Sequence, residues 1–212
     1  MNNLEFIYNR KSIRKFKEDK IVKEDIVKLL EAATQAPSPK NQQTWHFVVL
    51  QNKDIINKMA EIVTKNHIYL AEIAKEEKQR KLMMSTLPYY VCFKDAPVVI
   101  IVYSKAYKMI EEDILKANNV NKEVIDILKS THSEVQGIGA AVENFLLAAT
   151  ALGYGACYMT GPAHSKKEIE ELIDFKKEGY ELMAMISLGV PEDDTVKSTP
   201  RKPLDEVVTF ID

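Results

Sequence analysis

The sequence is poor in cysteine, carries almost no net charge and has no long apolar run. Only Cys92 and Cys157 occur among the 212 residues, far apart and without metal-ligand spacing, so neither a disulfide framework nor a zinc site is predicted and both are expected to be core thiols. The 29 basic and 31 acidic side chains leave a formal charge of -2, which gives no reason to expect binding to nucleic acid or to an anionic membrane surface.

The N-terminal residues lack the apolar core of a signal peptide, and the clearest apolar stretches, 96–103 and 145–152, are far shorter than a membrane span. We therefore expect a cytoplasmic protein with no membrane partner. With 46% hydrophobic residues, a chain of this length can bury one sizeable core, so a single domain is expected over residues 1–212.

Hydrophobic periodicity predicts an alternation of helices and strands. Helices are predicted at 22–36, 54–64, 133–152 and 166–175, the last with Ser165 and Glu168 as a capping box. Strands are predicted at 47–50, 97–103, 153–159 and 180–190, and a strand-like pattern ends the tail at 197–212. The β-branched run at 97–103 is typical of a central strand covered on both faces. This order indicates an α+β, or three-layer, domain with one mixed sheet.

Three patterns that often carry function are weak or absent here. Gly137-Ile-Gly139 lacks the third glycine of a dinucleotide fingerprint and lies within a helical pattern. The four histidines form no Cys-His or Ser-His-Asp grouping by their spacing. The polar segment 65–90, rich in Lys, Glu, Gln and Met, instead predicts a helical excursion over the active site, which would carry substrate selectivity.

The run Asn-Arg-Lys-Ser-Ile-Arg-Lys-Phe-Lys-Glu at 9–18 is a candidate anion site. Arg10 and Arg14 each present a planar fork of donors that matches phosphate oxygens in pairs, and the Ser12 hydroxyl adds a third donor. The alternative is a solvated basic stretch that closes an N-terminal helix.

A second segment, Ala-Pro-Ser-Pro-Lys-Asn-Gln-Gln-Thr-Trp-His-Phe at 36–47, joins a helix to a strand. Together the two segments resemble the nitroreductase family, whose members begin with Arg-Arg-Ser-x-Arg-x-Phe and later carry Ala-Pro-Ser-x-x-Asn-x-Gln-Pro-Trp. Thr44 stands where the family has Pro. The resemblance implies a three-layer α/β/α fold with a mixed, largely antiparallel sheet, and a homodimer that holds FMN between its subunits, with the C-terminal tail extending onto the partner.

The resemblance also implies roles for the residues of the basic run. Arg10 and Ser12 match positions that grip the FMN phosphate, and Lys11 stands where Arg or His is common. Arg14 matches the position near flavin N1 and the C2 carbonyl, where a fixed cation stabilises the negative charge of the reduced flavin.

Further flavin contacts are implied outside the basic run. The loop that reaches the flavin from the partner subunit is matched by Pro37, Ser38, Asn41 and Gln43. The segment that lies against the flavin face is matched by Tyr158, Met159, Thr160 and Gly161. Gly161 permits close approach of the backbone, with an ordinary turn glycine as the alternative. Arg201 matches a C-terminal phosphate-binding arginine, for which Lys202 and a tail salt bridge are the alternatives.

The function implied is an FMN-dependent oxidoreductase with ping-pong kinetics. NADH or NADPH passes hydride to flavin N5 and leaves, and a small organic acceptor such as a nitroaromatic or a quinone takes its place. No side chain is required as a catalytic acid or base, and no metal is expected. Two alternatives stay open: a different flavin reaction on the same scaffold, namely dehalogenation, flavin destruction or enone reduction, and a non-catalytic FMN-binding protein.

Overall fold

The computed structural model describes residues 4–193 and 199–211. Its strands are β1 Trp45–Leu50, β2 Val98–Lys105, β3 Gly155–Met159 and β4 Tyr180–Gly189. Its α-helices are α1 Glu5–Asn9, α2 Lys23–Thr34, α3 Lys53–Glu72, α4 Glu77–Met84, α5 Leu87–Tyr90, α6 Glu112–Ala117, α7 Lys122–Lys129, α8 Ser133–Ala151 and α9 Lys166–Leu172. Short 3-10 turns are η1 Pro39–Asn41, η2 Cys92–Asp95, η3 Gly161–Ser165 and η4 Leu204–Glu206.

The four strands form one sheet in the order β1-β2-β4-β3, and each neighbouring pair is antiparallel. The register pairs Val48 with Ile101 and Ile100 with Ile186. A parallel contact joins the sheet only as an isolated bridge between Ser12 and Ala156. The predicted α+β class and the largely antiparallel sheet are confirmed, but the four described strands form a fully antiparallel sheet and not a mixed one.

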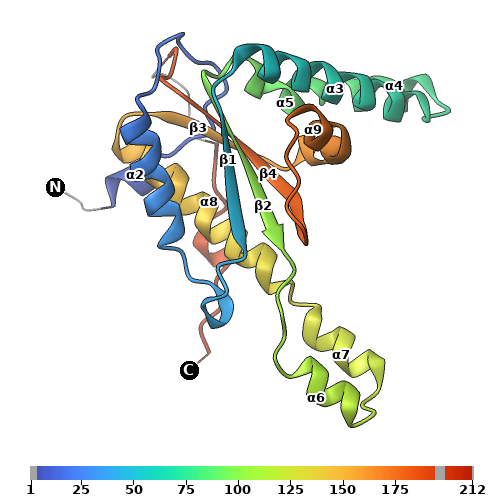
Figure 1. Cartoon of the computed structure of the whole chain (residues 1–212). Coiled ribbons are helices and arrows are strands. Elements are labelled where there is room, and N and C mark those ends of the chain that lie inside the picture. Colours follow the sequence, from blue (N-terminus) through green and yellow to red (C-terminus); the bar gives the residue numbers. More distant parts are fainter. Residues whose placement is uncertain (1–3, 194–198, 212) are drawn as a thin grey trace.

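Helices cover both faces of the sheet (Figure 1). Along β2, Ile100 and Val102 pack in the cluster that includes α2 and α8, whereas Val99 and Ile101 pack in the cluster that includes α3 and α9. Seven of the eight β2 residues are buried, because successive side chains of a strand point to opposite faces and both faces are covered. The prediction of a central strand at 97–103 is confirmed.

The polar segment 65–90 is helical, as predicted. Helix α3 continues past the predicted end at residue 64 to Glu72, because His67 and Ala71 extend its buried stripe by two more turns. Helices α4 and α5 complete the segment.

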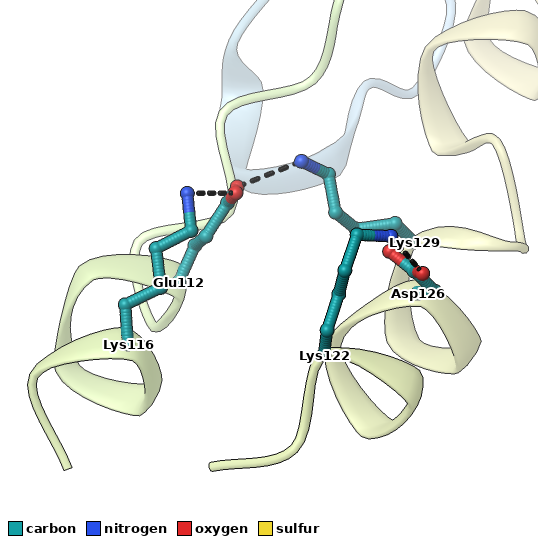
Figure 2. Close-up of polar contacts among 5 residues, drawn as sticks. All are labelled: Glu112, Lys116, Lys122, Asp126 and Lys129. Carbon is teal, nitrogen blue, oxygen red and sulfur yellow. Dashed lines mark hydrogen bonds and ion pairs between the residues drawn. The ribbon is translucent and has the colours of Figure 1, made fainter. Parts of the chain in front are cut away.

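Helices α6 and α7 form a hairpin that projects from the body of the protein (Figure 1). Glu112 on α6 joins the two helices, since its carboxylate lies 2.7 Å from Lys116 Nζ and 2.9 Å from Lys129 Nζ of α7. Lys122 and Asp126 form a further ion pair within α7 (Figure 2). Hydrogen bonds from the two lysines lower the pKa of Glu112 to about 2.

Two local predictions are wrong. Ser165 precedes α9, but it makes no side-chain capping bond to the helix. Asn66 of α3 instead donates through Nδ2 to Ser165 Oγ at 3.0 Å and to Glu168 Oε1 at 3.2 Å, so the two predicted capping groups bond to another helix. In the tail, the described residues 199–211 contain the turn η4 and no strand.

Among the described residues, no helix combines the length and the apolar character that crossing a membrane requires.

Candidate functional site

The basic run is an extended segment pinned against β3 and β4. Ile13 donates its backbone N–H to Ala156 O at 3.0 Å, and Ile13 and Phe16 are both buried. Two glycines make room for them: a Cβ added to Gly155 would lie 2.7 Å from Ile13, and one added to Gly189 would lie 2.6 Å from Phe16. The alternative of a solvated stretch that closes a helix is therefore wrong, because α1 ends at Asn9 and the run packs on the sheet.

The polar side chains of the run collect positive charge at this edge. Arg10 is half-buried, and its Nε lies 3.4 Å from Glu143 Oε1 of α8. Arg14 donates to the Ser12 carbonyl at 3.4 Å, and its guanidinium lies 5.4 Å from the centre of the Tyr89 ring. Glu143 pairs with Arg10, and the two guanidinium groups and the Ser12 hydroxyl together are a donor set that suits an anion with several oxygens.

The predicted segment 158–161 continues from β3 beside this charge. Tyr158 is 38% exposed, and partial burial raises its pKa. Met159 is buried and Thr160 is exposed. A Cβ added to Gly161 would lie 2.8 Å from the ring of Tyr90, so glycine is needed here for an aromatic ring to approach the backbone.

The two cysteines meet beneath the basic run, which the sequence did not predict. Both are buried free thiols, so the expectation of core thiols is confirmed. A hydrogen bond from Cys92 and the positive charge of Arg14 lower the pKa of Cys157 to about 7, against an opposing effect of burial. The same hydrogen bond, together with burial, raises the pKa of Cys92.

The loop at 37–43 is folded on itself. Ser38 Oγ accepts from the Gln43 backbone N–H at 2.7 Å, and Gln43 Nε2 donates to Asn41 Oδ1 at 3.1 Å. Lys40, Asn41 and Gln43 adopt positive φ values of 48°, 50° and 44°. Such backbone is costly for residues other than glycine, so the surrounding contacts fix this loop in one shape.

The structure explains the threonine that replaces the family's proline. Thr44 is 3% exposed, and its hydroxyl accepts from Ser104 Oγ at 3.2 Å. Its carbonyl accepts from the Lys105 backbone N–H at 3.0 Å. Thr44 thus joins the start of β1 to the end of β2 with its buried hydroxyl paired.

One chain does not bring all the predicted residues together. The loop at 37–43 packs near the start of α8, since a Cβ added to Gly137 would lie 3.9 Å from the Pro37 carbonyl oxygen. Figure 1 shows this loop at the C-terminal end of α2, whereas the basic run lies toward the N-terminal end of that helix. Arg201 is exposed and donates to the Thr199 carbonyl at 2.8 Å. Among the described residues, neither the loop nor Arg201 has a hydrogen bond or an ion pair with the basic run.

The residues that do meet form a site with two parts. One part is the cationic edge made by Arg10, Ser12 and Arg14. The other is aromatic and backbone surface, from Tyr89 to the exposed side of 158–161. Such a pairing suits a planar ring that carries a phosphate.

Comparison with known proteins gives a consistent result. The sequence model of the Nitroreductase family matches residues 7–190. A relative from Archaeoglobus fulgidus, provisionally named NADH dehydrogenase/NAD(P)H nitroreductase, is 30% identical over 193 residues, which are 90% of this chain and 86% of the relative.

Solved structures agree in fold. A BluB-like flavoprotein from Clostridium difficile 630 is 37% identical, with a TM-score of 0.91 and complete coverage of both chains. A nitroreductase with bound FMN from Bacteroides fragilis is 21% identical, with a TM-score of 0.70 and complete coverage of both chains.

Proposed function

Since this chain belongs to the Nitroreductase family, we propose that it is an oxidoreductase that binds FMN and transfers hydride from NADH or NADPH to a small organic acceptor. The observation that carries the proposal is the cationic run pinned against β3, directly beside the segment 158–161. The Bacteroides fragilis structure with bound FMN has the same fold, which supports the choice of cofactor.

Each part of the site has a separate role in this proposal. Arg10 and Ser12 hold the phosphate, for which Arg10 exchanges part of its pairing with Glu143. Arg14 sets a permanent positive charge beside the ring and favours the reduced, negatively charged cofactor. The bound FMN supplies the hydride chemistry, and the chain supplies position and charge.

The two tyrosines at the end of the helical segment 65–90 border the same site. Tyr89 lies against Arg14, and the Tyr90 ring lies against Gly161. These two contacts support the proposal that the segment 65–90 shapes the space available to the acceptor.

A second copy of the chain would complete the site. The loop at 37–43 and Arg201 are matched to flavin contacts, yet neither meets the basic run of its own chain. Large apolar side chains are also exposed on the elements that would face a partner, with Phe210 and Ile211 of the tail 88% and 93% exposed. We propose a homodimer in which the loop and the tail of each subunit reach the FMN of the other. Dilution to monomer should then release FMN, and a stable monomer that keeps its flavin would contradict the shared site.

The visible spectrum of the purified protein tests the proposed function. We expect flavin bands that bleach on anaerobic addition of NADPH or NADH, which would also identify the donor. Arg10→Ala should weaken FMN binding, whereas Arg80→Ala, which removes an exposed ion pair in α4, should not. Bands that persist with both nicotinamides would refute turnover, and failure to bind added FMN would refute the cofactor.

The acceptor is identified by a second measurement on the reduced protein. Nitroaromatics and quinones should restore the flavin bands under anaerobic conditions. A halogenated phenol or an enone that restores them faster would replace these acceptors, and a permanent loss of flavin absorbance on admission of air would indicate flavin destruction.

A further inference from the structure

We propose that Gln42 is a positioning residue, which braces the loop at 37–43 against the base of the hairpin α6–α7 and thereby controls how tightly FMN is held. The base of the hairpin is the segment 107–111, which leads from β2 into α6. Gln42 fills a position that the family motif leaves open. The inference rests on the proposed function, because it takes Asn41 and Gln43 as contacts of the FMN.

The Gln42 side chain holds the main chain of Lys108 by two hydrogen bonds. Its Nε2 donates to the Lys108 carbonyl at 2.7 Å, and its Oε1 accepts from the Lys108 backbone N–H at 3.0 Å. The main chain fixes the orientation of the amide, since an N–H only donates and a carbonyl only accepts. The half-buried Gln42 therefore joins two segments that are 66 residues apart in the sequence.

An ion pair joins the same two segments. Lys40 Nζ lies 2.6 Å from Glu111 Oε1, at the residue that precedes α6. Both side chains are exposed, so this pair contributes less than the two bonds of Gln42. Among the described residues, the hydrogen bonds and ion pairs that leave the loop all go to the segment 107–111.

The loop requires a brace because its backbone is strained. The φ values of Lys40, Asn41 and Gln43 lie in the left-handed region, which disfavours residues that carry a Cβ. Bonds inside the loop, such as the one from the Gln43 N–H to Ser38 Oγ, span at most five residues. Strained backbone persists only where surrounding contacts hold it, so a loop released from Lys108 should relax to other shapes.

The expected effect on FMN is a shift of population. Two net hydrogen bonds move the equilibrium between the braced and the released loop by about tenfold or more. The apparent affinity for FMN falls only in proportion to the braced fraction, which is close to one in the wild type. We therefore expect a large change in the released fraction and a smaller change in FMN binding.

Gln42→Ala tests the brace by two measurements on the full-length protein. Tryptic cleavage after Lys40, without added FMN, follows the released fraction and should accelerate by about fivefold to tenfold. Quenching of FMN fluorescence, at a fixed protein concentration, should show binding weakened by about twofold to fivefold. Gln51→Ala is the matched control, because it removes a glutamine bond to the Ile21 carbonyl at the other end of β1, and it should match the wild type in both.

Two substitutions of Lys40 separate positioning from general damage. In the Gln42→Ala background, Lys40→Gly relieves strain at a left-handed residue and should restore FMN binding toward the wild-type value. Lys40→Met loses the same ion pair with Glu111 but keeps the strain, so it should restore nothing. A merely structural role of Gln42 would not distinguish these two substitutions.

Several outcomes would overturn the inference. Unchanged cleavage after Lys40 in Gln42→Ala would refute the brace. Faster cleavage with unchanged FMN binding would refute the positioning role, and so would equal rescue by Lys40→Gly and Lys40→Met. A wild type that binds no FMN would refute the proposed function and the positioning role with it, and the cleavage rates would still decide whether Gln42 braces the loop.

Discussion

Replacing Gly161 by Ala would put a methyl group into the ring of Tyr90. The added Cβ would lie 2.8 Å from the ring, whereas ordinary contact begins at 3.4 Å, so the ring must retreat by about 0.6 Å. Overpacking of this kind costs about 1–3 kcal/mol, and the lower chain entropy of Ala in the unfolded state returns about 0.4–1 kcal/mol. We expect Gly161→Ala to lower the free energy of unfolding by about 1–2 kcal/mol.

Urea unfolding followed by the fluorescence of the single tryptophan, Trp45, measures this loss at a fixed protein concentration. Gly139→Ala is the matched control, because its Cβ would meet no atom within 4 Å and Ala is the better helix former, so it should stabilise by about 0.5–1 kcal/mol. In a Tyr90→Leu background the cost of Gly161→Ala should largely disappear. An equal cost in both backgrounds would refute the assignment of the glycine to the tyrosine ring.

Three further predictions concern the site and the projecting hairpin. Gly155→Ala should displace Ile13, which lies 2.7 Å from the added Cβ, and weaken FMN binding by about tenfold; unchanged quenching of FMN fluorescence would contradict this. Arg14→Ala should lower the two-electron flavin midpoint potential by about 20–40 mV, the equivalent of roughly 1–2 kcal/mol, and an unchanged potential would remove its assigned role. Glu112 has its pKa lowered from 4.5 to about 2, so its stabilising effect is complete above pH 4.5 and is lost as the pH falls from 4.5 to 2. The protection factors of the hairpin amides, which remove the intrinsic pH dependence of exchange, should fall over this window in the wild type and should be low throughout in Glu112→Gln.

The elements that the sequence predicted best are those with one clear pattern of apolar or small residues. The run at 97–103 becomes β2 because both of its faces are covered, and the small-residue helix at 133–152 becomes α8. The antiparallel order of the strands depends on contacts between distant segments, which periodicity does not report.

The motifs predicted residues for the candidate site, but they did not predict how the fold packs those residues against the sheet. In a regular strand, residues three apart point to opposite faces, whereas Ile13 and Phe16 both pack on the sheet. They have room there only because Gly155 and Gly189 carry no side chain. The thiol pair escaped prediction for the same reason, since Cys92 joins the site through the fold and not through spacing along the chain.

The side chain of Asn66 has a consequence for how this chain folds. Helix α9 has seven residues and no side-chain cap of its own, because Ser165 and Glu168 accept hydrogen bonds from α3, 99 and 102 residues earlier in the sequence. A helix this short is marginal in isolation. It therefore gains stability only after α3 has docked, and the two helices should open together in native-state exchange as one cooperative unit.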